Sequence, residues 1–293
     1  MRRRDFLSAA ALMLLGCRPH FGGLTIGSKN FTEQLILGEL LAQYLEAAIK
    51  TAMDRRFYLA GTYICQQALL AGRIDLYVEY TGTALAAVLK EKAISGHQQV
   101  FDQVHRDYAR RFNLKVMPPL GFDNSFALVM RRADADEKHL TKLSQLAPFA
   151  PQMRMGVGYE FLERPDGYKG LVAKYGLKFA EPPRVMDLGL LYRALESRQV
   201  DIVAGSNTDG LIAALNLVVL DDDLKYFPPY DAVPIVRPDA LRRYASLEDS
   251  LNHLAGKINI QAMRQMNYAV DGQKQDAARV AREFLRTHNL LAS

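Results

Sequence analysis

Short apolar runs alternate with longer helical runs from Leu24 onward, and this alternation limits the folds that the chain can adopt. Strands are predicted at residues 24–26, 56–60, 74–78, 153–157, 200–203 and 217–220. A helix over residues 31–48 follows the first strand, and another helix follows the second. Alternating strands and helices form mainly parallel sheets covered by helices. The pattern therefore predicts an α/β fold that binds ligands at the carboxyl ends of its strands.

One helix-to-strand segment recurs in the second half of the chain. Residues 67–76 (QALLAGRIDL) match residues 193–202 (RALESRQVDI) in an Ala-Leu pair and in the start of the strand. The match is either chance or the sign of two lobes of similar construction. Two such lobes would place the loops after the two strands, residues 79–83 and 205–210, opposite each other across a cleft.

The first predicted helix begins beside Asn30, and Glu33 follows three residues later. This spacing predicts a capping box, in which Asn30 caps the helix and Glu33 reaches back to it. Lys29 precedes this N-terminus, where the helix dipole disfavours a cation. Lys29 is therefore either a surface lysine or part of an anion site that also uses the helix N-terminus.

The N-terminus has the pattern of an export signal. A basic segment, residues 2–4, precedes an apolar run over residues 6–16 that is too short to cross a bilayer as a helix. The run leads into Cys17 and resembles a lipoprotein signal, with residues 1–16 removed, Cys17 lipidated and residues 17–23 forming a tether.

Residues 3–7 (RRDFL) also resemble a twin-arginine export motif. The alternative to lipidation is a plain secretory signal with an unrelated Cys17. Both interpretations predict an exported protein, and lipidation predicts a membrane anchor on the periplasmic or cell-surface side.

The chemistry-bearing residues do not indicate catalysis. A net charge of +5 with scattered basic residues does not suggest a nucleic-acid surface. The six histidines show no metal-ligand spacing, and the chain has neither a Gly-x-Ser-x-Gly elbow nor a Walker loop. We therefore predict no enzyme activity, no cofactor and no metal; the acidic run at residues 221–223 is expected to be a solvated turn, with a metal cluster as the alternative. Cys65 is expected to be a small buried hydrophobe rather than a reactive thiol.

Five motifs in order are similar to those of one family, the substrate-binding proteins of osmoprotectant ABC importers for quaternary amines. They are residues 26–34 (IGSKNFTEQ), 75–83 (DLYVEYTGT), 121–128 (GFDNSFAL), 164–168 (RPDGY) and 227–232 (FPPYDA). The resemblance extends over roughly residues 24–290.

The resemblance implies a two-lobed periplasmic-binding-protein-like fold of type II, with the ligand cleft between the lobes and two hinge crossings. Lobe 1 would comprise residues 24–122 and 208–293, and lobe 2 residues 123–207. A single chain is expected to act as a monomer.

The resemblance also implies a ligand site. Lys29 and Arg164 would contact a ligand carboxylate, and Tyr80 and Tyr192 would form an aromatic cage around its ammonium group. For Arg164 the alternative is a salt bridge to Asp166 or Glu163, and for each tyrosine it is a core or surface aromatic. Further expected contacts are a cage ring from Phe126 and hydrogen bonds from Thr81 and Thr83.

The loop at residues 205–210 departs from the family pattern. Ser206 stands where family members often have a cage tyrosine, and Asn207 follows it. These side chains offer hydrogen bonds and space but no aromatic face. Loss of one cation–π contact costs roughly 0.5–2 kcal/mol, so we expect either weaker binding or a larger, more polar ligand.

The resemblance implies an extracytoplasmic solute-binding component of an ABC importer. It would capture a quaternary amine such as glycine betaine, carnitine or choline and deliver it to a permease driven by an ATPase. The alternatives are a ligand-sensing domain for a membrane receptor and a binding protein for a larger polar betaine. A hydrolase ranks third, because no nucleophile–base pair is evident.

Overall fold

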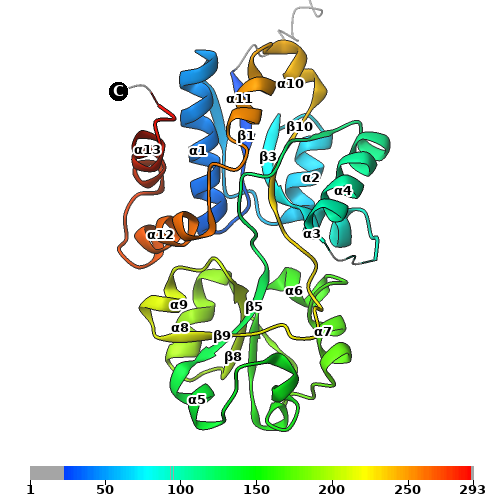
Figure 1. Ribbon diagram of the computed structural model, residues 1–293, viewed down its shortest axis with the longest axis vertical. Helices are drawn as coiled ribbons and strands as arrows, with labels where there is room; N and C mark the ends of the chain where they lie inside the picture. Colours follow the sequence, from blue (N-terminus) through cyan, green and yellow to red (C-terminus); the bar gives the residue numbers. More distant parts are fainter. Residues whose placement is uncertain (1–22, 93, 95, 292–293) are drawn as a thin grey trace, which may run out of the picture.

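The computed structural model describes residues 23–92, 94 and 96–291, which form two lobes, each built on a five-stranded sheet (Figure 1). The predicted export signal and Cys17 lie outside the described residues. Among the helices of the described part, none is both long and apolar enough to cross a membrane.

Lobe 1 has the strand order β2-β1-β3-β10-β4. Its strands are β1 (Leu24–Gly27), β2 (Met53–Arg56), β3 (Leu76–Tyr80), β4 (Lys115–Val116) and β10 (Ala232–Val236). Its helices are α1 (Thr32–Ile49), α2 (Thr62–Leu70), α3 (Thr81–Thr83) with the π-helical turn Ala84–Val88, α4 (His97–Phe112), α10 (Pro238–Arg243), α11 (Leu247–His253), α12 (Ile260–Asp271) and α13 (Ala277–Thr287).

Lobe 2 has the strand order β7-β6-β8-β5-β9. Its strands are β5 (Phe126–Arg131), β6 (Met155–Val157), β7 (Arg184–Val185), β8 (Ile202–Ser206) and β9 (Leu217–Leu220). Its helices are α5 (Arg132–Glu137), α6 (Tyr159–Glu163), α7 (Tyr168–Tyr175), α8 (Leu191–Glu196) and α9 (Leu211–Ala214), with 3-10 turns at Leu143–Leu146, Ala150–Gln152 and Leu188–Leu190.

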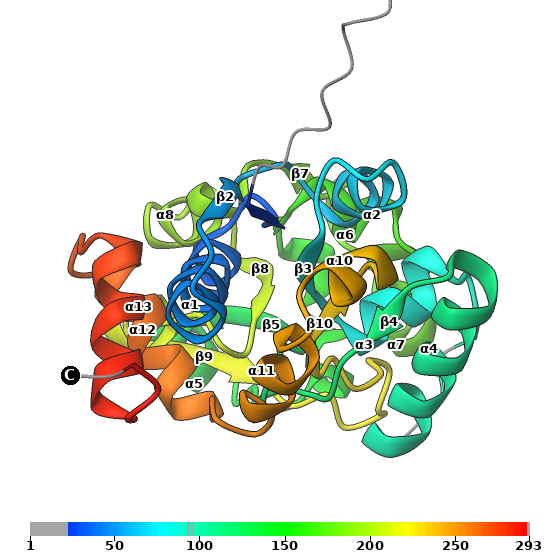
Figure 2. The same ribbon diagram turned by 90° about the horizontal axis from the view of Figure 1, so that it is seen from above.

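Helices cover both faces of each sheet. In lobe 1, α1, α12 and α13 lie on one side of the sheet and α2 and α4 on the other (Figure 2). The alternating side chains of β3 serve both cores, because successive residues of a strand point to opposite faces. Tyr80 packs on the α1 side and Tyr77 on the α2 side, together with Cys65. Cys65 is fully buried, as expected, and its burial raises the pKa of the thiol to about 12.

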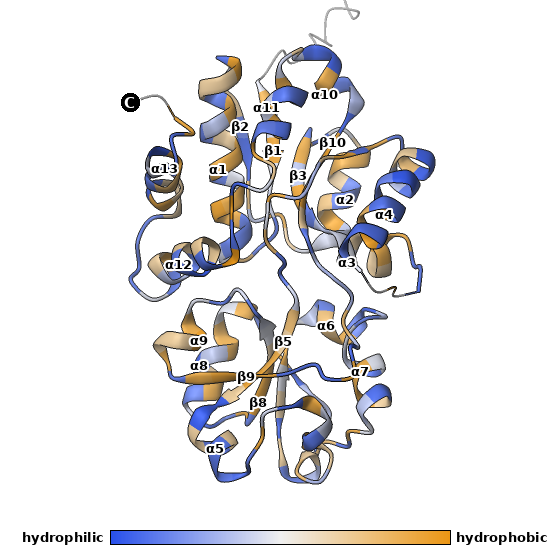
Figure 3. Cartoon of the chain, viewed as in Figure 1, coloured by the Kyte–Doolittle hydropathy of each residue, from blue (hydrophilic) through white to orange (hydrophobic). Residues whose placement is uncertain are grey.

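Hydropathy follows the same arrangement. In Figure 3, β5 and β9 are largely hydrophobic, whereas α4 presents a mixed surface at the outside of lobe 1. The fully buried Val100, Val104 and Tyr108 form the inner stripe of α4, at helical spacing. Both lobes therefore have a core of their own beneath each sheet face.

The segment repeated in the sequence is a structural repeat. In lobe 1, Asp75 precedes β3, and its carboxylate accepts a hydrogen bond from the Thr25 backbone N–H of β1 at 3.0 Å. In lobe 2, Asp201 precedes β8 and accepts from the Arg154 N–H, just before β6, at 2.8 Å. Each aspartate thus ties the start of its strand to the parallel neighbour, so the prediction of two similarly built lobes is confirmed.

Two details of the predicted architecture need correction. The sheets are mixed rather than mainly parallel, because β10 runs antiparallel to β3 and β4, and β5 runs antiparallel to β8 and β9. The second hinge crossing also comes later than the predicted boundary at Thr208. Strand β9 pairs with β5, so the chain stays in lobe 2 beyond Leu220 and returns through residues 221–231 (Figure 1).

Candidate functional site

The predicted site residues lie where the two lobes meet, at the ends of strands β1, β3 and β8 and the start of β5. Lys29 follows β1, Tyr80 ends β3, Ser206 ends β8 and Phe126 begins β5. This placement agrees with the rule that ligands of α/β sheets bind beyond the carboxyl ends of strands. The structure thus brings residues far apart in the sequence to one region.

Lys29 is not a surface lysine. Its side chain is 3% exposed, and its ammonium donates to the carboxylate of Glu79, which is fully buried. Glu79 also accepts hydrogen bonds from the Tyr77 hydroxyl at 3.1 Å and from the Tyr80 N–H at 2.8 Å. The charge of Lys29 is therefore compensated within lobe 1.

Arg164 forms one of the two salt bridges that the sequence left open, the one to Asp166. Its Nε donates to Asp166 at 2.9 Å, its Nη2 donates to the other carboxylate oxygen, and its Nη1 donates to Thr83 Oγ1 at 3.0 Å. Burial lowers the pKa of the guanidinium, but Asp166 outweighs that effect and raises it above its ordinary value. Because Thr83 belongs to lobe 1, Arg164 also links the lobes.

Both buried cations lie over aromatic rings. The Lys29 ammonium is 4.8 Å from the centre of the Tyr80 ring, and the Arg164 guanidinium carbon is 4.9 Å from that of Phe126. These distances are within the range of cation–π attraction. Arg164 also lies 5.9 Å from the ring centre of Tyr230, which the sequence did not single out. The ring faces of this region therefore accept cations.

Tyr192 and Ser206 meet at Asp209. The Tyr192 hydroxyl and the Ser206 N–H both donate to one Asp209 carboxylate oxygen. Burial raises the pKa of that carboxyl to about 7. Tyr192 packs in the lobe 2 core with Leu195, in agreement with the alternative of a core aromatic. The Ser206 hydroxyl donates to Asn124.

Thr81 uses its hydroxyl within the protein, whereas the side-chain Oδ1 of Asn207 is buried without a hydrogen-bond donor in the described structure. Thr81 Oγ1 donates to the Pro229 carbonyl at 3.1 Å and accepts from the Asp231 N–H at 3.0 Å, which ties β3 to the second crossing. The Asn207 carbonyl accepts from Arg264 of α12 at 2.8 Å. Thr81 thus stabilises the hinge, and Asn207 joins lobe 2 to lobe 1.

Glu33 has a different role from the predicted one. Helix α1 has Phe31 at its N-cap and no side-chain cap, so the expected Asn30–Glu33 capping box does not form. Instead Glu33 is 2% exposed and accepts from the Tyr80 hydroxyl at 2.6 Å, from Asn267 Nδ2 at 3.0 Å and from Asn124. Asn124 in turn accepts from Ser206. We call Glu33, Tyr80, Asn124, Ser206 and Asn267 the interlobe junction.

A further contact joins the lobes at the N-terminus of α2. The Glu160 carboxylate, on α6 of lobe 2, accepts a hydrogen bond from the Thr62 N–H at 2.8 Å. The free N–H groups and partial positive charge of a helix N-terminus favour such an anion. Gly61 makes the approach possible, because a Cβ at this position would lie 2.0 Å from the Glu160 oxygen.

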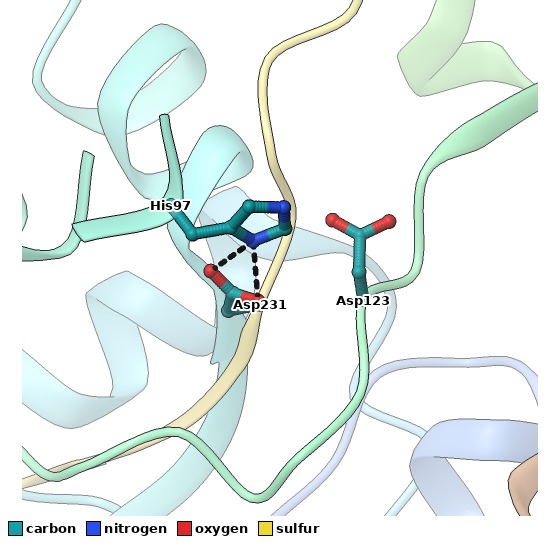
Figure 4. A group of neighbouring side chains, drawn as sticks. All are labelled: His97, Asp123 and Asp231. Carbon is teal, nitrogen blue, oxygen red and sulfur yellow. Dashed lines mark hydrogen bonds and ion pairs between the residues drawn. The ribbon is translucent and has the colours of Figure 1, made fainter. Parts of the chain in front are cut away.

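His97, Asp123 and Asp231 come together at the hinge, although no sequence spacing indicated it (Figure 4). His97 Nδ1 lies 2.9 Å from Asp231, whose carboxyl pKa is raised by burial. Imidazole and carboxylates can ligate divalent cations. However, the Asp123 oxygens already accept from Ser125 and Tyr230, and Asp123 and Asp231 form a β-bridge between the crossing segments. These contacts support a role in the hinge.

Comparisons with known proteins agree with this geometry. The family model "Substrate binding domain of ABC-type glycine betaine transport system" matches residues 22–287. A carnitine transport binding protein of Listeria monocytogenes is 32% identical over 293 residues, which cover 97% of this chain and 94% of that protein.

Two further relatives differ in the ligand that they name. A solved structure of a glycine betaine/carnitine/choline ABC transporter protein has a TM-score of 0.76 and 32% identity, covering 91% of this chain and 99% of that one. An ergothioneine transport permease/ergothioneine binding protein of Helicobacter pylori is 34% identical over 264 residues, 89% of this chain but only 47% of that protein.

The buried pair of Lys29 and Glu79 yields a stability prediction. Lys29→Met should lower the free energy of unfolding by about 3–5 kcal/mol, because it leaves the Glu79 carboxylate buried without a cation. The double variant Lys29→Met/Glu79→Gln should recover most of that loss, since no uncompensated charge remains. Urea unfolding measures both values. If the double variant is as unstable as Lys29→Met, the loss does not come from an unpaired Glu79 charge, which would contradict the role given to the Lys29–Glu79 pair.

The Glu160 contact yields a prediction about the position of the lobes. Glu160→Ala should shift the population toward separated lobes by about 1–3 kcal/mol, because it removes a charged hydrogen-bond acceptor from the α2 N-terminus. Distances between one spin label on each lobe would report the shift. Glu163→Ala, an exposed glutamate on the same helix, is the control and should leave the distances unchanged. Equal behaviour of the two variants would argue against a Glu160 contact that holds the lobes together.

Proposed function

The chain belongs to the family of substrate-binding domains of ABC-type glycine betaine transport systems, and we propose that it captures a small quaternary amine between its lobes. Proteins of this family are extracytoplasmic binding components of importers. Glycine betaine, carnitine and choline, the ligands named for its relatives, are the candidates.

The observation that carries the proposal is the pair of cation–ring contacts. Rings from lobe 1 (Tyr80) and from the start of lobe 2 (Phe126) both bind a cation of the protein at cation–π distance. A quaternary ammonium has no N–H to donate, so ring faces are its natural partners in a protein. We propose that the ligand ammonium competes with Lys29 and Arg164 for these faces when the lobes separate.

The remaining predicted residues would line the same region. Thr83 and Ser206 would offer hydroxyl groups, and Tyr192 would hold Asp209 in place beside Ser206. Arg164 and Lys29 keep N–H groups beyond those that bind Asp166 and Glu79, but each cation is neutralised by its partner, so a ligand carboxylate would gain little from the two predicted contacts. Contacts from both lobes to one ligand would favour lobe closure, the hinge motion common to binding proteins.

Delivery follows from the family. We propose that the loaded protein docks as a monomer on a permease driven by an ATPase, and that lipidated Cys17 holds it at the membrane surface. Cys17 lies outside the described residues, so the anchor rests on the sequence pattern. No catalytic role is proposed for any residue.

A larger polar betaine is a second candidate. The relative from Helicobacter pylori is named an ergothioneine binding protein, and ergothioneine carries a ring as well as a betaine group. The supporting observation is Ser206, which gives the junction a small hydroxyl bonded to Asn124 and Thr208 instead of an aromatic wall.

Titration calorimetry with matched ligands tests the proposal. The quaternary amines are glycine betaine, carnitine, choline and ergothioneine. Two primary amines serve as matched controls: glycine for glycine betaine, and ethanolamine for choline. We expect one-to-one binding by at least one quaternary amine and binding weaker by roughly tenfold or more for its primary-amine partner.

Two results would contradict the proposed function. The first is the absence of saturable heat with every quaternary amine. The second is equal affinity for a quaternary amine and its primary-amine partner, since the ring faces would then not select the methylated cation.

A further inference from the structure

We propose that Glu33 sets the charge type of the ligand, so that this protein prefers a cation without a carboxylate, such as choline, to a zwitterion such as glycine betaine. The inference rests on the proposed function, because it takes the interlobe junction as the binding region. It adds a specificity-determining residue and narrows the ligand class by its net charge.

Glu33 is a buried carboxylate with neutral partners. It is 2% exposed and accepts from the Tyr80 hydroxyl and from the side-chain amides of Asn124 and Asn267. Within the described part of the chain, no lysine, arginine or histidine forms an ion pair with it. A buried charge without an opposite charge is unfavourable, so this position favours a positively charged occupant.

The buried cations nearby are already compensated. Lys29 pairs with Glu79, and Arg164 pairs with Asp166 through two hydrogen bonds. Each of these pairs has no net charge. The surplus charge of the region is therefore negative and includes that of Glu33.

Two further carboxylates lie near the N-terminus of α1. Asp271 accepts a hydrogen bond from the Thr32 hydroxyl at 2.6 Å. Burial is the main cause of the raised pKa of Asp209, and the charges of Glu33 and Asp271 raise that pKa further. Neither aspartate has an ion pair within the described residues. Burial raises the pKa of both carboxyls, that of Asp209 to about 7, and a cation bound beside them would favour their charged forms.

Asn267 provides a second, independent sign of a missing partner. It is 2% exposed, and its Nδ2 donates to Glu33 and to the Thr208 carbonyl, both at 3.0 Å. Its Oδ1 is buried without a hydrogen-bond donor in the described structure. An unpaired buried acceptor beside a carboxylate suits a ligand that carries both a positive charge and a donor, as the ammonium and hydroxyl of choline do.

A ligand carboxylate would find the opposite environment. To reach Lys29 or Arg164 it would approach Glu79 or Asp166, and like charges at such distances repel. A zwitterion therefore gains less here than a cation of similar size. The charge balance of the junction, rather than the shape of a cage, would set the preference.

The test compares three ligands on two variants of the intact protein by calorimetry. The ligands are choline, its neutral carbon isostere 3,3-dimethylbutan-1-ol, and glycine betaine. The variants are Glu33→Gln and Glu39→Gln, each checked by its melting temperature. Glu39 is the matched control, because it is a buried glutamate on the same helix that pairs with Arg55.

Three results are expected. For the native protein, the dissociation constant of choline should be at least roughly tenfold lower than that of glycine betaine and that of the neutral isostere. Glu33→Gln should remove most of the preference for choline. Glu39→Gln should leave the ratios unchanged.

The opposite results separate the two proposals. Tighter binding of glycine betaine than of choline by the native protein, or an unchanged ratio in Glu33→Gln, would overturn the role of Glu33 while the proposed function stands. Binding of none of the quaternary amines would overturn both. If Glu33→Gln does not fold, the ligand series on the native protein still decides the charge preference.

Discussion

The buried ion pair between Lys29 and Glu79 is the interaction on which the rest of the site depends. Both side chains lie almost fully out of water, so neither charge could remain there without the other. The pair joins the end of β1 to β3 and places the Lys29 ammonium over Tyr80. With Tyr80 held in this way, its hydroxyl reaches Glu33, and the junction between the lobes is built from there.

The same principle explains how the lobes meet. Arg164 and Asp166 form a second buried pair in lobe 2, and Arg164 extends to Thr83 in lobe 1. Glu160 reaches the α2 N-terminus, and Asn267 reaches the Thr208 carbonyl. These contacts are polar, and the lobes are connected by two crossing segments, so a hinge motion at those segments can separate them. Ligand contacts made in both lobes would then add to the same set of interactions.

Much of the fold could be predicted from the sequence, because the alternation of strands and helices and the repeated segment around Asp75 and Asp201 are local patterns. The antiparallel direction of β5 and β10 could not, since it depends on how the chain crosses between lobes. At the site, Lys29, Tyr80 and Arg164 were recognised from motifs. Asp166 was also named, as one of two possible partners of Arg164. The partners of Lys29 and Tyr80 were not recognised. Glu79 within a buried strand was a signal that a charge needed compensation, whereas Asn267 has no local pattern that would reveal its contact with Glu33.

The most direct test of the account is a crystal structure of the protein with choline bound. We expect the quaternary nitrogen between the lobes, within about 6 Å of the Tyr80 ring centre and beside the Glu33 carboxylate, with contacts to both lobes. A nitrogen remote from Glu33, for example in the groove between α9 and α12 lined by Ile212 and Tyr268, would contradict the central claim that the junction is the binding site.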